Sequence, residues 1–284
     1  MATIYQNYTQ QELDHQYNAQ ATVGDITPFI ETYIQDSAAA RAGLTYQGGL
    51  AYGPGPEETL DLFPAGKKAP LLVFIHGGYW RMLSKNESSF MAEHMVDNGV
   101  AIAAVNYTLR PHATLDDIVA EVRRSISWLY HNGSDYDVDP ERIYIAGSSA
   151  GGHLAGMVVS TGWHESFDLL SDVIKGGMLL SGLYDLEPVA LSYANEWMEL
   201  DPEAARRNSP VHFLPECGCP LIISYGGSET AEFKRQSEDY AGQWQAAGFE
   251  LDCFELTEHN HFDIPLELGI KGSVLSQKML NLIG

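Results

Sequence analysis

A serine flanked by glycines stands where an apolar run ends and a stretch of small residues begins. Residues 142–146 alternate and are β-branched, which favours a buried parallel strand, and residues 150–160 have apolar spacing compatible with a helix. Gly147 and Gly151 lack Cβ atoms, so a sharp strand-to-helix turn can raise the Ser149 hydroxyl above a sheet. The pattern predicts that Ser149 is a nucleophile.

A serine hydroxyl is a weak nucleophile unless an imidazole takes its proton, and the imidazole in turn needs a carboxylate to orient it. Glu229 follows a predicted strand at 220–225, and His261 follows the next one at 251–256. The carboxyl ends of parallel strands meet at one edge of a sheet, where catalytic groups gather. We therefore predict that Ser149, Glu229 and His261 form a catalytic triad.

Two other carboxylates lie near these positions. Asp185 also follows a predicted strand and is the alternative acid, because related folds sometimes supply the acid one strand earlier. Glu229 is favoured, since it lies just beyond the strand that precedes the His261 strand. Asp263 is too close to His261 in sequence to orient it easily, and we expect it to be a helix N-cap.

The same positions offer two alternatives to a catalytic triad, a metal site and a cofactor site. His259 and His261, together with Asp263, could hold a metal ion, but no further ligand follows at helical spacing. The glycine-rich run at 147–152 has Ser149 where a dinucleotide-binding fingerprint needs glycine. We therefore expect no metal and no cofactor, and hydride transfer is disfavoured.

The run His-Gly-Gly-Tyr-Trp at 76–80 follows a continuous apolar strand. Its two glycines allow the backbone to turn its amides inward. The amides of Gly78 and Tyr79 could then join that of Ala150, at the start of the predicted helix, around one developing oxyanion. We expect His76 to brace this loop.

The remaining pattern alternates strands with helices, which predicts an α/β fold with a mainly parallel central sheet and helices on both faces. Residues 49–55 are rich in turn-forming residues. Further predicted strands cover 59–63, 70–75, 100–105 and 177–183, and further predicted helices cover 29–41, 87–98, 115–130, 187–200, 230–247 and 264–282.

Two segments lie outside this alternation. Residues 1–44 form an N-terminal arm that covers a sheet edge or, alternatively, builds an active-site wall with Tyr17 and its neighbours. Residues 184–215 are predicted to form a small lid-like insertion, because long excursions in compact α/β folds are usually functional loops. At 284 residues, we expect a single domain spanning 1–284.

The composition limits which classes of binding partner the protein can have. With 16 Lys and Arg against 38 Asp and Glu, the net charge of -22 disfavours binding to nucleic acid or anionic membranes. The first residues do not form a signal peptide, no apolar run could span a bilayer, and the three cysteines suit reduced thiols. We expect a cytoplasmic protein that acts on a small molecule, with a homodimer left open.

The sequence resembles the kynurenine formamidase (arylformamidase) branch of the α/β-hydrolases, whose mark is His-Gly-Gly-x-Trp, here residues 76–80. The likeness extends over most of the chain. It includes Leu-Asp-x-x-Tyr-Asn at 13–18, the Gly-x-Ser-x-Gly-Gly-His turn at 147–153, the Glu-Phe-x-Arg-Gln-Ser run within 229–237, and Asn-His-Phe at 260–262. The resemblance implies an α/β-hydrolase fold and an oxyanion hole made by the second glycine and the residue after it.

Two departures from the family pattern affect what it implies. The acid is Glu229, where better-known members tend to have aspartate, and the swap is chemically tolerable. Relatives of bacterial appearance include esterases of unassigned substrate. The implied activity is hydrolysis of an N-formyl aromatic amide such as N-formylkynurenine, with water as the co-substrate. A short-chain carboxylesterase and a non-catalytic binding scaffold are the alternatives.

Bulky rings near these motifs are candidates for the substrate pocket. Tyr79, Trp80, Trp197 and Phe262 are predicted to bind substrate. For Trp80, as for His153, packing beneath the serine turn is an equal alternative.

Overall fold

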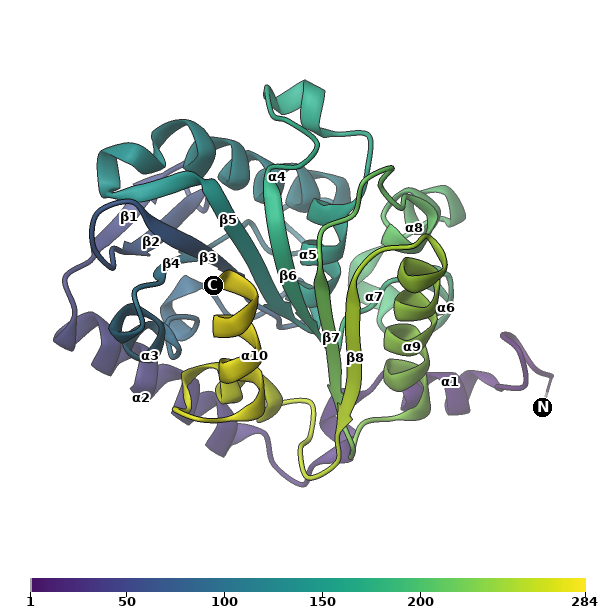
Figure 1. Ribbon diagram of the computed structural model, residues 1–284. Helices are drawn as coiled ribbons and strands as arrows, with labels where there is room; N and C mark the ends of the chain where they lie inside the picture. Colours follow the sequence, from purple (N-terminus) through teal and green to yellow (C-terminus); the bar gives the residue numbers. More distant parts are fainter. Residues whose placement is uncertain (1) are drawn as a thin grey trace.

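The computed structural model describes residues 2–284, which are built around one eight-stranded sheet in the order β1-β2-β4-β3-β5-β6-β7-β8 (Figure 1). The five neighbouring pairs from β4 to β8 are parallel, and β1 and β2 join as antiparallel strands. The mainly parallel sheet that was predicted is therefore confirmed. The strands are β1 (Gln47–Ala51), β2 (Thr59–Phe63), β3 (Ala69–Ile75), β4 (Ala101–Val105), β5 (Val138–Ser148), β6 (Ile174–Leu180), β7 (Leu221–Gly226) and β8 (Leu251–Leu256).

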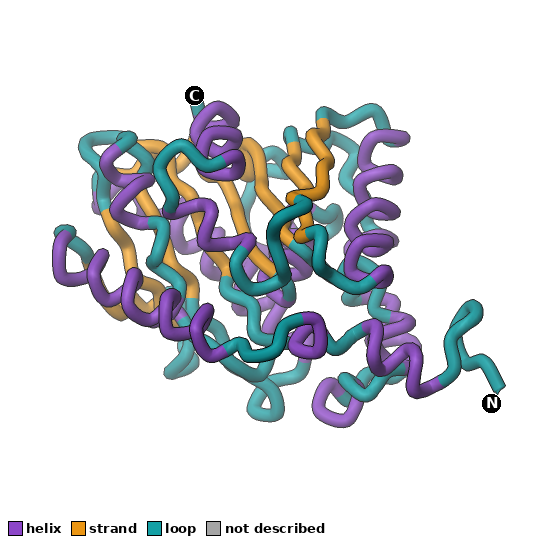
Figure 2. The backbone as a smooth tube through the Cα atoms, turned by 90° about the horizontal axis from the view of Figure 1, so that it is seen from below, coloured by secondary structure: helices purple, strands orange, loops and turns teal. Residues whose placement is uncertain are grey.

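Helices lie on both faces of the sheet (Figure 2). The α-helices are α1 (Gln10–Gln16), α2 (Thr27–Gly43), α3 (Ala92–Asp97), α4 (Leu115–Asn132), α5 (Ala150–Val159), α6 (Glu187–Leu191), α7 (Asn195–Met198), α8 (Pro202–Arg207), α9 (Ala231–Ala246) and α10 (Val274–Ile283). Short 3₁₀ helices cover Ala19–Thr22, Lys85–Glu87, Gly133–Tyr136, His164–Phe167, Pro210–His212 and Ile264–Gly269.

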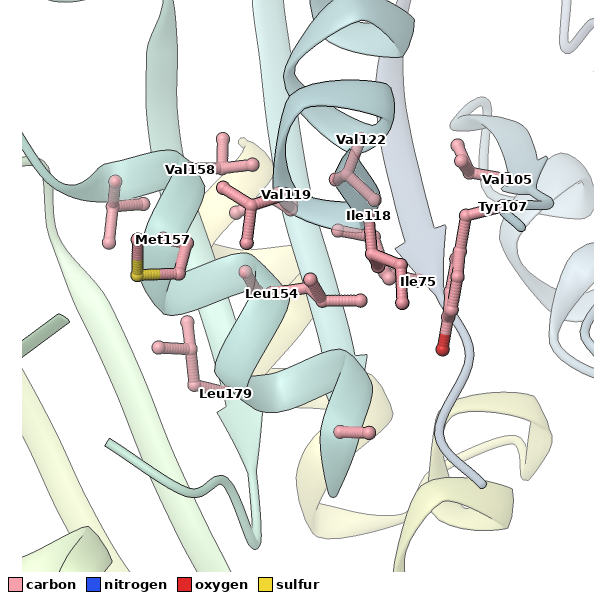
Figure 3. Close-up of a cluster of buried hydrophobic side chains, with 14 of the residues drawn as sticks. Ile75, Val105, Tyr107, Ile118, Val119, Val122, Leu154, Met157, Val158 and Leu179 are labelled. Atoms are coloured by element: carbon pink, nitrogen blue, oxygen red, sulfur yellow. The ribbon is translucent and has the colours of Figure 1, made fainter. Parts of the chain in front are cut away.

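The central strand β3 shows why both faces need cover, because all seven of its residues are buried. Val73 and Ile75 pack into a core shared with α4, α5 and α9, whereas Leu72 and Phe74 pack into a core shared with α2, α3 and α10. Figure 3 shows the first core between α4, α5 and the sheet. A strand buried on both sides reads as a continuous apolar run, which is why the sequence located β3 well.

Residues at the first turn of a helix mark where α2 and α4 begin. Thr114 caps α4, and its side chain and that of Asp117 exchange the two hydrogen bonds of a capping box. Pro28 occupies the first turn of α2, where the missing amide hydrogen costs nothing. These signals explain why α2 and α4 lie within a few residues of their predicted ranges.

Three predicted helices were too long. Residues 87–98 contain only α3 after a 3₁₀ turn, and 264–282 break into a 3₁₀ helix and α10 around Gly272, whose φ is +82°. Residues 187–200 divide into α6 and α7. Ser192 separates them, because its hydroxyl donates to the Val189 carbonyl and accepts from the Ala194 amide, an alternative to helical bonding.

The turn-rich stretch at 49–55 also differs from expectation, since β1 enters it and pairs with β2. Gly49 has a φ of +68°, and the register shifts between Gln47 and Leu50. A bulged edge strand with two glycines has little apolar alternation, so its sequence reads as a turn.

In the N-terminal arm, α1 contacts α6 and α9, and α2 contacts α3 and the 3₁₀ helix at Lys85–Glu87. Its helix α2 contributes Tyr33 and Ala40 to the second core. The segment 184–215 follows β6 and holds α6, α7, α8 and the 3₁₀ helix at Pro210–His212. Both segments approach the edge of the sheet to which Ser149 belongs, and both contribute to the cavity there.

Candidate active site

Ser149 occupies a strained turn between β5 and α5. Its φ of +58° and ψ of -120° lie outside the regions that L-residues usually adopt. A Cβ on Gly151 would come within 2.0 Å of the Ile75 carbonyl oxygen, and one on Gly147 within 2.2 Å of the Gly151 oxygen. The turn therefore needs glycine at both positions, and the Ser149 amide is held by a 2.8 Å bond to the Leu180 carbonyl.

Glu229 and His261 are brought together although 32 residues separate them. Nδ1 of His261 lies 2.9 Å from Oε2 of Glu229, and both side chains are buried. The other Glu229 oxygen accepts hydrogen bonds of 2.6 Å from the Ser181 hydroxyl and from the Gly226 amide. A carboxylate with these partners is fixed in position, and it directs the Nδ1 hydrogen of His261 toward itself and leaves Nε2 free.

Two glycines let the loops after β7 and β8 touch. A Cβ on Gly226 would lie 2.7 Å from the His259 carbonyl oxygen, and a Cβ on Gly227 would lie 2.3 Å from the Thr257 oxygen. The Ser228 amide also donates to the His259 carbonyl at 3.0 Å. This close approach carries Glu229, at the end of one loop, to His261 at the end of the other.

The loop at 76–80 passes directly beside Ser149, because a Cβ on Gly77 would lie 3.2 Å from the Ser149 Cβ. Gly78 and Tyr79 have φ values of +94° and +54°. Within residues 2–284, the amides of Gly78, Tyr79 and Ala150 donate no hydrogen bond to any protein group. Backbone amides that are free to donate are what an oxyanion forming at Ser149 would require.

Two further buried histidines, His76 and His153, contact backbone carbonyls near this site. His76 stacks on Tyr107 with ring centroids 4.1 Å apart, and its Nδ1 contacts the Gly77 carbonyl oxygen at 2.9 Å. Nε2 of His153 lies 2.7 Å from the Asn208 carbonyl oxygen. Burial lowers the pKa of each to about 4, so both are neutral near pH 7 and act as bracing groups.

Ser149 and His261 line one cavity of about 190 Å³. Of the rings predicted to bind substrate, Tyr79 and Phe262 line it too. The arm supplies Asn18, Ala19 and Gln20, whereas Tyr17 is fully buried behind them. The arm therefore forms a wall of the cavity through the neighbours of Tyr17.

The prediction that Trp80 binds substrate was wrong. Trp80 is fully buried and packs edge-on against His153, with ring centroids 5.0 Å apart. Its φ of +58° follows the positive φ of Tyr79, and the two rings are inclined at 72°. Successive left-handed residues turn the Tyr79 ring into the cavity and the Trp80 ring into the core.

The prediction that Trp197 binds substrate also needs correction, because its ring lies behind the cavity wall. Its Nε1 donates to the Tyr79 carbonyl at 3.2 Å, and its ring meets that of Tyr79 edge-on at 5.5 Å. The insertion reaches the cavity through Tyr193 instead. The break between α6 and α7, which the sequence did not reveal, places Tyr193 there.

Several lining residues were missed by the sequence reasoning. Ile26, Ile30 and Tyr33 line the cavity from the start of the arm's long helix. Their spacing of four and three residues puts them on one helix face, so this apolar face was a readable signal. Arg81, Met82 and other residues after the His-Gly-Gly-Tyr-Trp run had no comparable signal.

Neither Asp185 nor Asp263 takes the place of Glu229 beside His261. Oδ1 of Asp185 accepts from the Glu187 amide at 3.1 Å, at the start of α6. Asp263 precedes a 3₁₀ helix but makes no side-chain cap bond to it, contrary to expectation. It accepts from the Asn260 amide at 2.8 Å and contacts Nδ1 of His259 at 3.2 Å, so it holds the turn before His261.

Among residues 2–284, no group of three or more His, Cys, Asp and Glu side chains is arranged to hold a metal ion. In the same part of the chain, no helix is both long and apolar enough to cross a bilayer.

Known proteins match this chain over most of its length. It is 36% identical over 243 residues to a kynurenine formamidase of Danio rerio, a match that covers 83% of this chain and 81% of that protein. A kynurenine formamidase of Salmo salar is 34% identical over 244 residues, with the same coverage. The esterase LipQ of Mycobacterium tuberculosis is 24% identical, and 83% of this chain covers 61% of it.

Solved structures share the fold. A crystal structure of a Silicibacter sp. protein proposed to be a thioesterase has a TM-score of 0.81 at 26% identity, over 96% of this chain and 98% of that one. A Pyrobaculum calidifontis esterase has a TM-score of 0.73 at 16% identity, over 96% of both chains. Residues 60–175 also match the BD-FAE family. The α/β-hydrolase fold is thus confirmed, and the chain is a hydrolase that belongs to the kynurenine formamidase family.

Proposed function

We propose that this protein is a serine hydrolase that cleaves an N-formyl aromatic amide to formate and the free amine. The observation that carries the proposal is the cavity where Ser149, the His261–Glu229 pair and the uncommitted amides of the 76–80 loop meet. The names of the two fish relatives, kynurenine formamidases, point to N-formylkynurenine as the model substrate.

In the proposed mechanism, Oγ of Ser149 attacks the formyl carbon and its proton moves to Nε2 of His261. The amides of Gly78, Tyr79 and Ala150 hold the oxyanion that forms. The carbon–nitrogen bond then breaks as His261 returns the proton to the leaving nitrogen, which releases the aryl amine. Water attacks the formyl-enzyme, His261 takes its proton, and formate leaves with Ser149 restored.

The test is turnover of N-formylkynurenine and formanilide by the wild type, Ser149→Ala and His261→Ala. Each substitution should lower kcat by about 1000-fold or more while the circular dichroism spectrum is unchanged. Intact-mass measurement after treatment with a fluorophosphonate should show one adduct in the wild type and none in Ser149→Ala. Near-wild-type turnover by either variant would remove that residue from the mechanism.

The second candidate is a short-chain carboxylesterase, which the esterase relatives favour. Tyr79 and Phe262 line the cavity with Ser149, so a longer acyl chain must displace a ring or the adjoining loop. Formyl and acetyl aryl substrates should therefore exceed butyryl esters in kcat/KM by about tenfold or more. Equal or better hydrolysis of octanoyl esters would favour the esterase. A non-catalytic scaffold has no support from either group of relatives.

We also propose a reducing compartment, the cytoplasm, as the protein's location. Cys217, Cys219 and Cys253 are all free thiols in the described residues. A homodimer stays a prediction, which sedimentation of the purified protein tests.

A further inference from the structure

Arg81 places a positive charge on the wall of the cavity that holds Ser149 and His261. Its side chain is exposed, and its guanidinium carbon lies 3.6 Å from the centroid of the Trp197 ring. Trp197 is itself fixed by the bond from its Nε1 to the Tyr79 carbonyl. This cation–π contact favours one position of the guanidinium beside the cavity, and it leaves the N–H donors available to an anion.

This charge has no acidic partner within residues 2–284, where the Arg81 side chain makes neither an ion pair nor a hydrogen bond and only its backbone amide is bonded, to the Gly78 carbonyl. By contrast, Arg207 pairs with Asp116 at 2.8 Å and Arg235 pairs with Glu232 at 2.8 Å. Arg81 differs from these two in carrying, on the cavity wall, a charge that no acidic group offsets.

The other groups that surround Arg81 do not neutralise it. Glu87 lines the same cavity, but its Oε2 accepts from the Ser84 hydroxyl at 2.9 Å and it forms no ion pair with Arg81. Tyr193 and Tyr79 are the nearby titratable rings. Burial raises the pKa of Tyr193, and the charge of Arg81 opposes that rise.

We propose that Arg81 binds a carboxylate at the far end of the substrate's leaving group, so that the preferred substrates are aryl amides carrying a negative charge. This inference rests on the proposed hydrolysis of N-formyl aryl amides. A net charge of -22 repels an anion over most of the surface, so an anionic substrate needs a local cation near the reacting serine. A planar guanidinium suits a carboxylate because two of its N–H groups can bond both oxygens.

The test compares N-formylkynurenine with its neutral-tail analogue, in which the carboxylate is replaced by a carboxamide. Both are measured with the wild type, Arg81→Gln, Arg81→Lys and Arg206→Gln. Arg206 is a matched control, since it is an exposed arginine of α8 that does not line this cavity and also lacks an ion pair in the described residues.

The wild type should prefer the acid over the carboxamide by about tenfold or more in kcat/KM, mostly through KM. Arg81→Gln should abolish that preference, Arg81→Lys should retain part of it, and Arg206→Gln should keep it. The KM for the acid should also rise with salt, because the pair forms at an exposed site. A preference that survives Arg81→Gln, or no preference in the wild type, would overturn the proposal.

The result separates this inference from the proposed function. Hydrolysis of the carboxamide by the wild type supports formamidase activity whatever happens at Arg81. If the wild type cleaves neither formamide, the formamidase proposal fails. Arg81 is then tested with a pair of aryl acetates, one with a ring carboxylate and one with a ring carboxamide, by the ratio of their kcat/KM values. A wild-type preference for the carboxylate that disappears in Arg81→Gln would still support the anion site, and a ratio that Arg81→Gln leaves unchanged would reject it.

Discussion

The hydroxyl of Tyr79 donates a 2.7 Å hydrogen bond to the backbone carbonyl of Tyr17, which lies 62 residues earlier in the chain. Tyr17 in turn donates its own hydroxyl to Oε2 of Glu232 at 2.9 Å and accepts from Nε2 of Gln236 at 3.1 Å. The N-terminal arm therefore connects the loop that carries the candidate oxyanion amides to α9, the helix that begins just after Glu229.

Removing the Tyr79 hydroxyl tests this connection. Tyr79→Phe should lower the free energy of unfolding by about 1 kcal/mol, because a partly buried carbonyl loses its donor. It should also lower kcat, since the loop loses its anchor to the arm. Tyr193→Phe is the control: this tyrosine lines the same cavity, and its hydroxyl makes no hydrogen bond within residues 2–284. Chemical denaturation and turnover should give the same values for both variants if the bond has no role.

Glu229 should matter both for turnover and for stability. Glu229→Ala removes the acceptor of the Ser181 hydroxyl and the Gly226 amide, so the free energy of unfolding should fall by about 2 kcal/mol. It should lower kcat by about 100-fold or more, but less than Ser149→Ala does. Asp185→Ala should change kcat little, because that carboxylate faces the Glu187 amide. A larger loss in Asp185→Ala than in Glu229→Ala would reassign the acid.

The buried His153 should make the fold sensitive to mild acid. Its folded-state pKa of about 4 lies below the ordinary value of 6.5, so the unfolded chain binds more protons between these two values. The contribution of neutral His153 to the free energy of unfolding is complete above the unfolded-state pKa of 6.5. It is lost as the pH falls toward the folded-state pKa of about 4. Between about pH 7 and about pH 5, the imidazole should account for about 2 kcal/mol of the loss.

Urea denaturation of the wild type and His153→Asn across that pH range measures the contribution. The variant is expected to be less stable near neutral pH, since the Asn208 carbonyl loses its partner, but its stability should fall less steeply with acid. Parallel slopes for the two proteins would mean that His153 does not titrate in this way.

The serine turn should tolerate no added methyl group. Gly151→Ala would place a Cβ 2.0 Å from the Ile75 carbonyl oxygen, which is backbone and cannot move aside, so we expect insoluble or strongly destabilised protein. Gly242→Ala is the control, because no atom lies within 4 Å of the added Cβ in the exposed middle of α9. It should raise the free energy of unfolding by about 0.5–1 kcal/mol. Thermal melting of both variants distinguishes a local clash from a general intolerance of glycine substitution.

The elements that the sequence predicted well carry their signal locally. The strand β2 and the strand β8 match their predicted ranges, and α9 differs from its prediction by one residue at each end. The positions of Ser149, Glu229 and His261 at strand ends followed from the same local patterns. Once parallel strands form one sheet, their carboxyl ends share an edge, so chain order alone brought these residues into one region.

The walls of the cavity needed the tertiary structure. Tyr79 and Trp80 are neighbours in sequence and similar in type, yet one ring lines the cavity and the other is buried in the core. Both residues have positive φ, so the loop has no periodicity from which the direction of a side chain can be read. Arg81 has its partner ring, Trp197, in a separate insertion, and only folding of the two segments against each other brings this stacked charge to the wall of the cavity that Ser149 also lines.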